Sequence, residues 1–298
     1  MSARRVTART PYFDLPADRT RAETARFRIL PVPYERTVSY GGGTRRGPMA
    51  IREASCQVEL WDEELGTDTS RVGIHTLPEF VKPLPPEAFC RALAKRVHEV
   101  HDPARALVVL GGEHSITPGI VAPLARRHPD LSVLQIDAHA DLRESYQGDR
   151  FSHACAAKRI LDHAPIVQVG IRNFSEEEVP FVGRGRVRTF LAHEHRGDRR
   201  LPAKVAKALS RRVWITFDID GLDPALVPGT GTPEPGGLGW FEALDVLRRV
   251  CEEREVLGFD VVEVAPIAGH DVSQFVAAKL TYRLMGYIAR ARGWLRGK

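Results

Sequence analysis

Three ionisable residues alternate with alanines directly after an apolar run of the chain. In the segment QIDAHADL (135–142) they are Asp137, His139 and Asp141. A carboxylate near a protein interior is costly unless it is paired, hydrogen-bonded or bound to a metal ion. Side chains two residues apart on an extended segment point the same way. The spacing therefore predicts that Asp137 and His139 share one compensating centre.

Three further segments place carboxylates or a histidine after an apolar run. Glu113 and His114 stand in VLGGEHS, Asp218 and Asp220 close ITFDID at the same two-residue spacing, and Glu263 follows VV in VVEV. A single D-x-D or H-x-D pair is usually a turn, a helix cap or a solvated edge. Four such segments together favour a metal centre with two ions, because two adjacent cations need several anionic ligands to offset their repulsion.

The donors gathered in this way are carboxylates and imidazoles, without a thiolate. Oxygen donors mixed with some imidazole suit manganese better than zinc, iron or cobalt. Two divalent ions roughly 3.5–4 Å apart share and acidify a water molecule, which gives hydroxide at neutral pH. The sequence therefore predicts a hydrolase that attacks an uncharged or cationic carbon centre.

Short runs rich in Val, Ile and Leu alternate with longer stretches of helical periodicity, and these elements must position the acidic segments. The pattern is typical of βα units that build a parallel sheet in an α/β fold. Strands are expected at 27–32, 71–75, 106–111, 131–137, 166–171, 187–190, 213–220 and 256–264. Helices are expected at 86–101, 201–210, 239–253 and 272–291. In such a sheet, ligands bind beyond the carboxyl ends of the strands, which is where the acidic segments lie.

Length and composition limit the class of protein. The 298 residues are 43% hydrophobic and show no linker or composition shift, which predicts one domain over 1–298 with an irregular N-terminal arm at 1–25. The sequence has neither an apolar run of about 18 residues nor a secretory signal, so we expect a cytoplasmic protein without a membrane partner. Its net charge of +5 comes without a nucleic-acid-binding motif, so no nucleic-acid partner is expected.

Five stretches of the chain resemble one known family. GGEHS, DAHADL and FDIDGLDPALVPGTGTPEPGG are similar to the signature segments of the ureohydrolases, the arginase and agmatinase family of manganese amidinohydrolases. VPYERTVSYGGGTRRGPMAIREAS (32–55) and GFDVVEVAP (258–266) match as well, so the resemblance runs from about residue 30 to near the C-terminus. It implies a three-layer α/β/α sandwich around a mainly parallel eight-stranded sheet, assembled as homotrimers or homohexamers.

The same resemblance implies a role for individual residues. Two Mn²⁺ ions would be held by six side chains, those of His114, Asp137, His139, Asp141, Asp218 and Asp220. A hydroxide that bridges the ions would attack the guanidinium carbon of a small cationic substrate, and collapse of the tetrahedral intermediate would release urea and an amine. His153 in FSHAC would protonate the leaving amine, and Glu263 would hold the guanidinium nitrogens.

The segment after the metal loop bears on the choice of substrate. YQGDRFSHACAAKRI (146–160) lacks the asparagine pattern of arginases and the glycine that follows their histidine. It is similar to bacterial and archaeal agmatinases and to aminopropylagmatine ureohydrolases of thermophilic bacteria. A substrate that is cationic at both ends is therefore favoured, with Tyr146 and Asp149 as contacts for its tail. The leading prediction is hydrolysis of agmatine to putrescine and urea, a step of polyamine biosynthesis.

Several alternatives stay open at this point. The same chemistry would serve N1-aminopropylagmatine, which would give spermidine, or a guanidino acid such as guanidinobutyrate, whose carboxylate Arg143 or Arg150 would bind. A deacetylase of related fold would use a single zinc ion, and the six candidate ligands argue against it. A non-catalytic relative typically loses ligands, whereas this chain keeps all six.

Overall fold

An eight-stranded parallel sheet forms the centre of the protein, whose computed structural model describes residues 11–295. The strand order is β4-β1-β5-β10-β9-β6-β7-β8, and every neighbouring pair is parallel. In this order the strands are β4 (Ile74–Thr76), β1 (Phe27–Val32), β5 (Ala106–Gly111), β10 (Glu255–Val262), β9 (Arg212–Asp218), β6 (Leu131–Ile136), β7 (Ile166–Ile171) and β8 (Val187–Leu191). A hairpin of β2 (Trp61–Asp62) and β3 (Thr67–Asp68) forms a separate small sheet.

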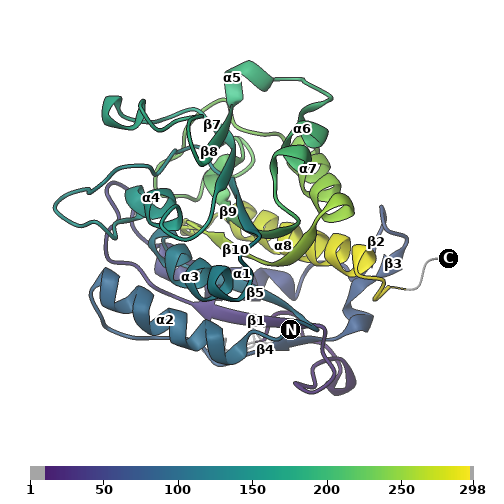
Figure 1. Cartoon of the computed structure of the whole chain (residues 1–298). Coiled ribbons are helices and arrows are strands. Elements are labelled where there is room, and N and C mark those ends of the chain that lie inside the picture. The colour runs from purple at the N-terminus through teal and green to yellow at the C-terminus, as the bar shows by residue number, and fades with distance from the viewer. Residues whose placement is uncertain (1–10, 296–298) are drawn as a thin grey trace.

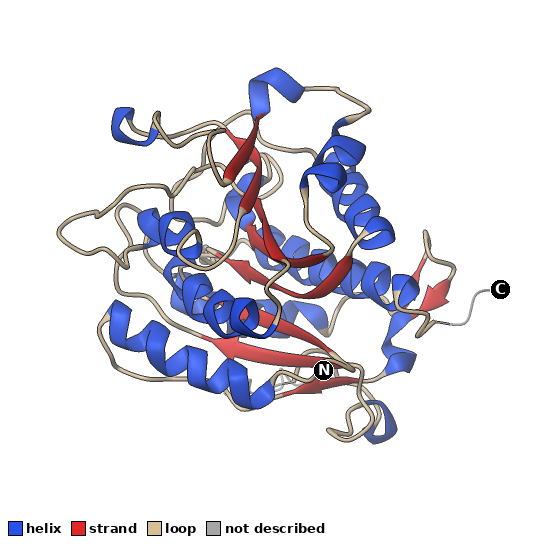
Figure 2. Ribbon diagram, in the orientation of Figure 1, coloured by secondary structure: helices blue, strands red, loops and turns tan. Residues whose placement is uncertain are grey.

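Helices cover both faces of the large sheet (Figures 1 and 2). One face carries α2 (Pro86–Val100), α3 (Thr117–Arg127) and α4 (Ala156–Ile160). The other carries α1 (Gly47–Ser55), α6 (Leu201–Ala208), α7 (Trp240–Glu253) and α8 (Val272–Ala291). The short α5 (Ala192–His195) follows β8. The predicted three-layer α/β/α sandwich around an eight-stranded parallel sheet is confirmed.

The strands are apolar on both faces because helices cover each side. In β5, Leu107 and Val109 join the apolar cluster under α2 and α3, whereas Val108 and Leu110 join the cluster under α1 and α8. Successive side chains of a strand point to opposite faces. A strand that is buried on both faces is therefore a continuous hydrophobic run, which made these strands visible in the sequence.

Several predicted strands end or begin elsewhere, two of them at a 3₁₀ turn. The strand expected at 71–75 is a 3₁₀ turn (Thr69–Val72) followed by β4, because Gly73 between them has a φ of +83° that extended backbone does not adopt. The strand expected through residue 220 ends at Asp218, where a second 3₁₀ turn (Ile219–Gly221) begins. None of the described helices is both long enough and apolar enough to cross a bilayer.

The N-terminal arm predicted at 1–25 is described from residue 11 onward. This part contains only a three-residue 3₁₀ helix (Ala17–Arg19), yet Tyr12 and Phe13 are buried. The hydroxyl of Tyr12 donates a hydrogen bond to the carbonyl of Ala278 in α8 at 2.7 Å. The arm is thus irregular but packed against the helical layer that includes α8. Residues 1–10 of the predicted arm lie outside the described residues.

Candidate metal centre and active site

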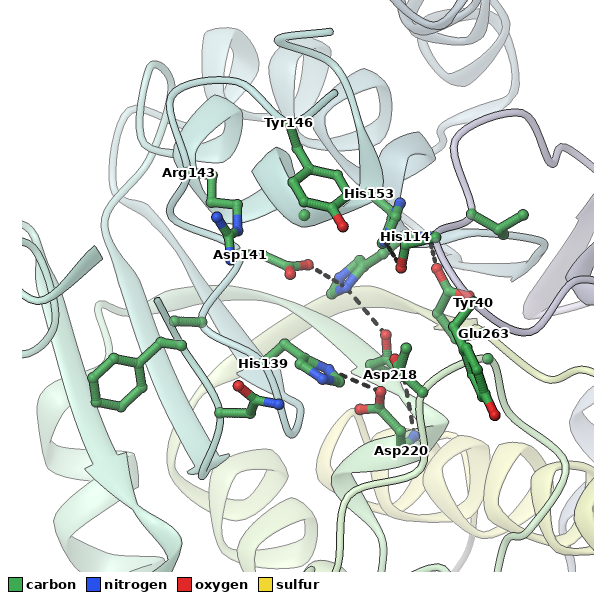
Figure 3. A pocket seen from close by; sticks show the side chains of 18 of the residues that line it. Tyr40, His114, His139, Asp141, Arg143, Tyr146, His153, Asp218, Asp220 and Glu263 are labelled. Atoms are coloured by element: carbon green, nitrogen blue, oxygen red, sulfur yellow. Dashed lines mark hydrogen bonds and ion pairs between the residues drawn. The ribbon is translucent and has the colours of Figure 1, made fainter. Parts of the chain in front are cut away.

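Four neighbouring strands deliver the site residues to one edge of the sheet. β5, β10, β9 and β6 are consecutive in the sheet although they are far apart in the chain. The segments after their carboxyl ends carry Glu113, His114, Glu263, Asp218, Asp220, Asp137, His139 and Asp141. The topology therefore brings the six predicted ligands together, as Figure 3 shows for the five of them that it labels.

The ring of His114 faces three carboxylates. Its Nδ1 lies 3.1 Å from Oδ2 of Asp137, 3.1 Å from Oδ2 of Asp141 and 3.3 Å from Oδ2 of Asp218. All four side chains are buried, and Nδ1 has no hydrogen-bond partner among the described residues. A buried nitrogen without a hydrogen bond, surrounded by carboxylate oxygens, is the arrangement that a bound cation would satisfy.

His139 forms a second group with two of the carboxylates. Its Nδ1 lies 3.0 Å from Oδ2 of Asp220 and 3.7 Å from Oδ1 of Asp137. Asp137 thus takes part in both groups, through a different oxygen in each. Ligand atoms of His114, Asp137 and Asp218 lie within 4.8 Å of one another, as do those of Asp137, His139 and Asp220. Each group is compact enough to surround one ion, with Asp137 common to both.

The chain turns after Ile136 in β6 and after Asp218 in β9, so the extended backbone expected for the Asp137–His139 and Asp218–Asp220 pairs is wrong, although Asp137 and His139 do share one ligand group. Oδ1 of Asp137 accepts the backbone N–H of His139 at 2.6 Å, and Oδ1 of Asp218 accepts that of Asp220 at 3.0 Å. Aspartate commonly binds the backbone two residues on in this way. In both pairs this leaves Oδ2 of the first aspartate facing the ring of His114.

Without a cation, the buried carboxylates repel one another. Burial and the charge of Asp137 raise the pKa of Asp141 to about 7, and burial with the charges of Asp220 and Asp137 raises the pKa of Asp218 well above its ordinary value. Burial alone would lower the pKa of His114, but the facing carboxylates hold it well above its ordinary value. Such shifts mark a concentration of negative charge that a divalent cation would neutralise.

Side chains of β9 and β10 fix which nitrogen of His114 faces the carboxylates. The two oxygens of Asp260 accept hydrogen bonds from the hydroxyl of Thr216 and from Nε1 of Trp214, both at 2.6 Å. Because Thr216 uses its only proton in this way, its oxygen accepts Nε2–H of His114 at 2.9 Å. The lone pair of neutral His114 is then on Nδ1, the nitrogen that points at the carboxylates. The residues present therefore fit a metal ion.

Two residues of the site have backbone conformations that non-glycine residues rarely adopt. φ is +54° at Asp141 and +63° at Glu263. A left-handed conformation costs on the order of 1 kcal/mol for such residues and persists where the surrounding structure imposes it. Both carboxylates are thus held in place by the fold itself.

His153, the predicted proton donor, lines the same cavity as His114 and Glu263. Its Nδ1 lies 3.2 Å from the hydroxyl of Thr37, and its Nε2 lies 3.5 Å from the hydroxyl of Ser39. Burial lowers the pKa of His153 to about 4. The ring is therefore neutral at pH 7 when the cavity holds no substrate.

Glu263 also lines this cavity, which has a volume of about 160 Å³. Its Oε1 accepts the backbone N–H of His114 at 2.6 Å. Burial and the charge of Glu113 raise the pKa of Glu263 well above its ordinary value. A cation beside this carboxylate would favour its ionised form.

The two residues predicted to contact the substrate's tail are placed differently. Tyr146 lines the cavity, and its ring lies edge-on to that of His153 with 5.9 Å between centroids. Asp149 is not part of the cavity wall, and its Oδ1 accepts the backbone N–H of Phe151 at 2.7 Å. The loop that carries both residues turns between them, since their backbones bond to each other. The structure thus brings Tyr146 to the cavity and leaves Asp149 outside it.

Arg143, considered above as a partner for an anionic tail, lines the cavity. It pairs with the carboxylate of Glu177 and lies 3.8 Å from that of Glu178. Its guanidinium also stacks over the ring of Tyr146 at 5.1 Å. Arg150 pairs with Glu144 at 2.5 Å and is not part of the cavity wall. The charge of Arg143 is therefore largely offset by its neighbours.

Comparison with known proteins supports the resemblance noted in the sequence. Residues 25–286 match the profile of the Arginase family. The chain belongs to this family. The prediction of a ureohydrolase is thereby confirmed at the level of the family.

Individual members of the arginase family are similar to this chain over almost its whole length. The N(1)-aminopropylagmatine ureohydrolase of Synechocystis sp. is 38% identical over 268 residues, which are 87% of this chain and 88% of that protein. The agmatinase of Pyrococcus horikoshii is 34% identical over 281 residues, which are 93% and 97%. The crystal structure of the agmatine ureohydrolase of Thermoplasma volcanium superposes with a TM-score of 0.86 at 29% identity, covering 96% of this chain and 97% of that chain.

Proposed function

We propose that this member of the arginase family hydrolyses the guanidinium group of agmatine and releases urea and putrescine. The observation that carries the proposal is the pair of ligand groups that share Asp137 beside a cavity lined by His153 and Glu263. Relatives named agmatinase and agmatine ureohydrolase support the choice of substrate. Assembly as a homotrimer or homohexamer in the cytoplasm belongs to the same proposal and rests on the family resemblance.

We assign two Mn²⁺ ions to the ligand groups. Nδ1 of His114 and carboxylates of Asp137, Asp141 and Asp218 would hold one ion, and Nδ1 of His139 with carboxylates of Asp137 and Asp220 would hold the other. Carboxylate and imidazole donors without a thiolate suit this hard cation. Two such ions supply a hydroxide nucleophile at neutral pH.

Three residues of the cavity act on the substrate in this proposal. Glu263 binds the guanidinium, because a carboxylate accepts paired hydrogen bonds from a planar guanidinium group. His153 transfers a proton to the leaving amine through Nε2. Tyr146 packs against the alkyl chain between the two cationic ends of the substrate.

The electrostatics of the cavity wall favour a cationic tail over an anionic one. Among the described residues that line the cavity, Arg143 is the only arginine or lysine, and Glu177 and Glu178 offset its charge. A carboxylate tail would therefore lose its hydration without gaining a free cationic partner. N1-aminopropylagmatine is the second candidate substrate, supported by the 38% identity to the Synechocystis aminopropylagmatine ureohydrolase.

Urea release by metal-free protein reloaded with Mn²⁺ tests the proposal. We expect kcat/KM for agmatine or aminopropylagmatine to exceed that for guanidinobutyrate and arginine by roughly 100-fold or more, a difference on the order of 3 kcal/mol in transition-state binding. A preference for guanidinobutyrate would refute the assignment of a cationic tail. Absence of urea from all four compounds would refute the proposed function.

Asp137→Asn supplies the matched test of the metal assignment. Loss of the shared carboxylate should remove metal-dependent urea release and lower the bound metal from two ions per chain. Asp162→Asn, at an exposed carboxylate outside the cavity, is the control and should keep both the urea release and the two bound ions. Full activity of Asp137→Asn, or wild-type activity with a single zinc ion, would contradict a two-metal centre.

A further inference from the structure

Glu113 is a buried carboxylate that belongs to neither ligand group and does not line the cavity. Its Oε2 accepts the backbone N–H groups of Arg36 and Thr37, both at 2.7 Å. Its Oε1 accepts the hydroxyls of Thr37 at 2.9 Å and of Ser115 at 2.5 Å. A carboxylate has about four lone-pair positions, and all four are occupied here. Each of these four hydrogen-bond partners of Glu113 is therefore a donor.

Thr37 consequently donates its only hydroxyl proton to Glu113. The oxygen of the same hydroxyl accepts the backbone N–H of His153 at 2.9 Å and lies 3.2 Å from Nδ1 of the His153 ring. Since Thr37 has no second proton to give, Nδ1 must be the donor in this contact. Neutral His153 is then the Nδ1–H tautomer, and its lone pair is on Nε2.

Two longer contacts of the ring do not oppose this assignment. The hydroxyl of Ser152 lies 3.4 Å from Nδ1, and that of Ser39 lies 3.5 Å from Nε2. Both distances are at the limit of a hydrogen bond and exceed the contact with Thr37. Ser39 is part of the cavity wall, so the unprotonated Nε2 is the nitrogen on the cavity side.

The turn that carries Glu113 is held against the segment that carries Thr37. The backbone N–H of Glu113 donates to the carbonyl of Tyr34 at 2.9 Å. At Gly112 an added Cβ would lie 2.0 Å from that carbonyl, so only glycine permits the approach. His114 follows directly on the same turn. One turn therefore positions both a candidate metal ligand and the carboxylate that orients Thr37.

We propose that Thr37 and Glu113 are positioning residues for His153, which hold its ring as the Nδ1–H tautomer. The bare Nε2 then accepts the proton that the attacking oxygen loses on addition to the guanidinium carbon, and passes it to the leaving amine as the C–N bond breaks. The part played by the leaving amine rests on the proposed function. The tautomer rests only on the hydrogen bonds around Thr37. The two parts can therefore be tested separately.

Substitution of Thr37 tests the catalytic part. Thr37→Val keeps the shape of the side chain but removes the hydroxyl, and we expect kcat to fall roughly 10- to 100-fold with KM changed less than about threefold. Thr37→Ser, which keeps the hydroxyl, should restore most of the activity. Thr44→Val is the matched control, because buried Thr44 follows in the same segment and its hydroxyl has no hydrogen-bond partner among the described residues. Equal kcat values for Thr37→Val and Thr44→Val would overturn this part.

The ¹⁵N NMR spectrum of the metal-free protein tests the tautomer without any turnover. The ring signals of His153 can be assigned by comparison with His153→Gln. We expect a protonated Nδ1 and a bare Nε2 in the wild type and in Thr44→Val, and loss of this preference in Thr37→Val. A protonated Nε2 in the neutral wild-type ring would overturn the proposal. If the wild type released no urea from any substrate, the proposed function would fail while this measurement still decided the role of Thr37.

Discussion

Two threonines determine which ring nitrogen is available at two histidines of this site. Thr216 donates its hydroxyl hydrogen bond to Asp260 and accepts one from Nε2–H of His114, which leaves Nδ1 of that ring for a cation. Thr37 donates its hydroxyl hydrogen bond to buried Glu113 and accepts one from Nδ1–H of His153, which leaves Nε2 for proton transfer. The two rings therefore have opposite tautomers, each suited to its role. In both cases a buried carboxylate orients one threonine hydroxyl, and that hydroxyl fixes the tautomer of the histidine.

Thr216→Val should weaken metal binding at His114. The variant removes the acceptor of Nε2–H but keeps a β-branched side chain of similar volume in β9, so the fold should tolerate it. We expect the affinity for Mn²⁺ to fall about 10- to 100-fold, as is typical when the partner of a metal-binding histidine is lost. Competition with a chelator measures this change. Thr281→Val is the control and should bind Mn²⁺ as the wild type does, because the hydroxyl of Thr281 donates to the carbonyl of Ala277 within α8. Unchanged affinity in Thr216→Val would show that His114 does not need this acceptor.

The sequence predicts the candidate ligands far better than the residues that orient them. Asp137 and His114 are conspicuous because charged or imidazole groups directly after an apolar run need compensation. Thr216 lies inside the apolar run VWITFD, where a threonine is ordinary for a strand. Thr37 lies in a loop and meets its partners only because distant segments fold together. Asp149 lies outside the cavity wall for the same reason, since spacing along a loop does not show which way the loop turns.

At the scale of elements, the central strands were predicted well and several helices were not. β1, β5 and β7 have the expected bounds because strands covered on both faces are continuous apolar runs. α3 was missed because its first eight residues are all buried and it has Pro123 inside, so it lacks the polar face that marks an amphipathic helix. β2 and β3 are two residues each, too short for any periodicity.

The helices α2 and α3 are followed by two histidines that lie against each other. The rings of His101 and His128 are edge-on with 5.8 Å between centroids. Neither ring nitrogen of buried His101 has a hydrogen-bond partner among the described residues. Burial, together with the charges of Arg127 and His128, lowers the pKa of His101 to about 4. The folded protein therefore favours the neutral ring more strongly than the unfolded chain does.

Because the pKa of His101 is lower in the folded protein than in the unfolded chain, acid should weaken the packing of α2 and α3. The ordinary pKa of histidine is about 6.5, so the contribution of neutral His101 to stability is present above pH 6.5 and is lost as the pH falls toward 4. His101→Gln cannot gain this charge. We expect urea unfolding midpoints at pH 7 and pH 4.5 to differ less in His101→Gln than in the wild type. His98→Gln, on the exposed side of α2, is the control and should behave as the wild type. An equal pH dependence in all three proteins would contradict the prediction.

At the scale of the whole molecule, one buried arginine joins the last helix to the N-terminal half of the chain. Nη1 of Arg283 in α8 lies 2.9 Å from Oδ1 of Asp62 and 2.9 Å from Oε2 of Glu64, in the hairpin of β2 and β3. Arg283 and Asp62 are only 2% and 1% exposed. Removing one partner of a buried ion pair leaves the other charge uncompensated.

Arg283→Met should therefore lower the free energy of unfolding by about 3–5 kcal/mol. Arg248→Met removes an arginine that pairs with Asp245 at 2.7 Å, in a pair about half-exposed, and should cost less than about 1 kcal/mol. Denaturant unfolding of both variants measures the difference. Metal content at saturating Mn²⁺ should stay the same in both, because neither arginine lines the cavity that holds the candidate ligands. Equal losses of unfolding free energy in the two variants would show that the buried ion pairs of Arg283 stabilise the fold no more than the exposed pair of Arg248.

The position of β10 between β5 and β9 has a consequence for the order in which a newly made chain matures. Before β10 is synthesised, the strands of residues 27–111 and those of residues 131–218 form two blocks that share no pairing, since β5 touches neither β9 nor β6. Asp137, His139 and Asp220 all follow strands of the second block, whereas His114 follows the last strand of the first. The half of the centre around His139 therefore uses only segments of the second block, and we expect it to form without β10, whereas the half around His114 needs both blocks. Occupation of the position beside His114 marks a chain whose two blocks have been joined.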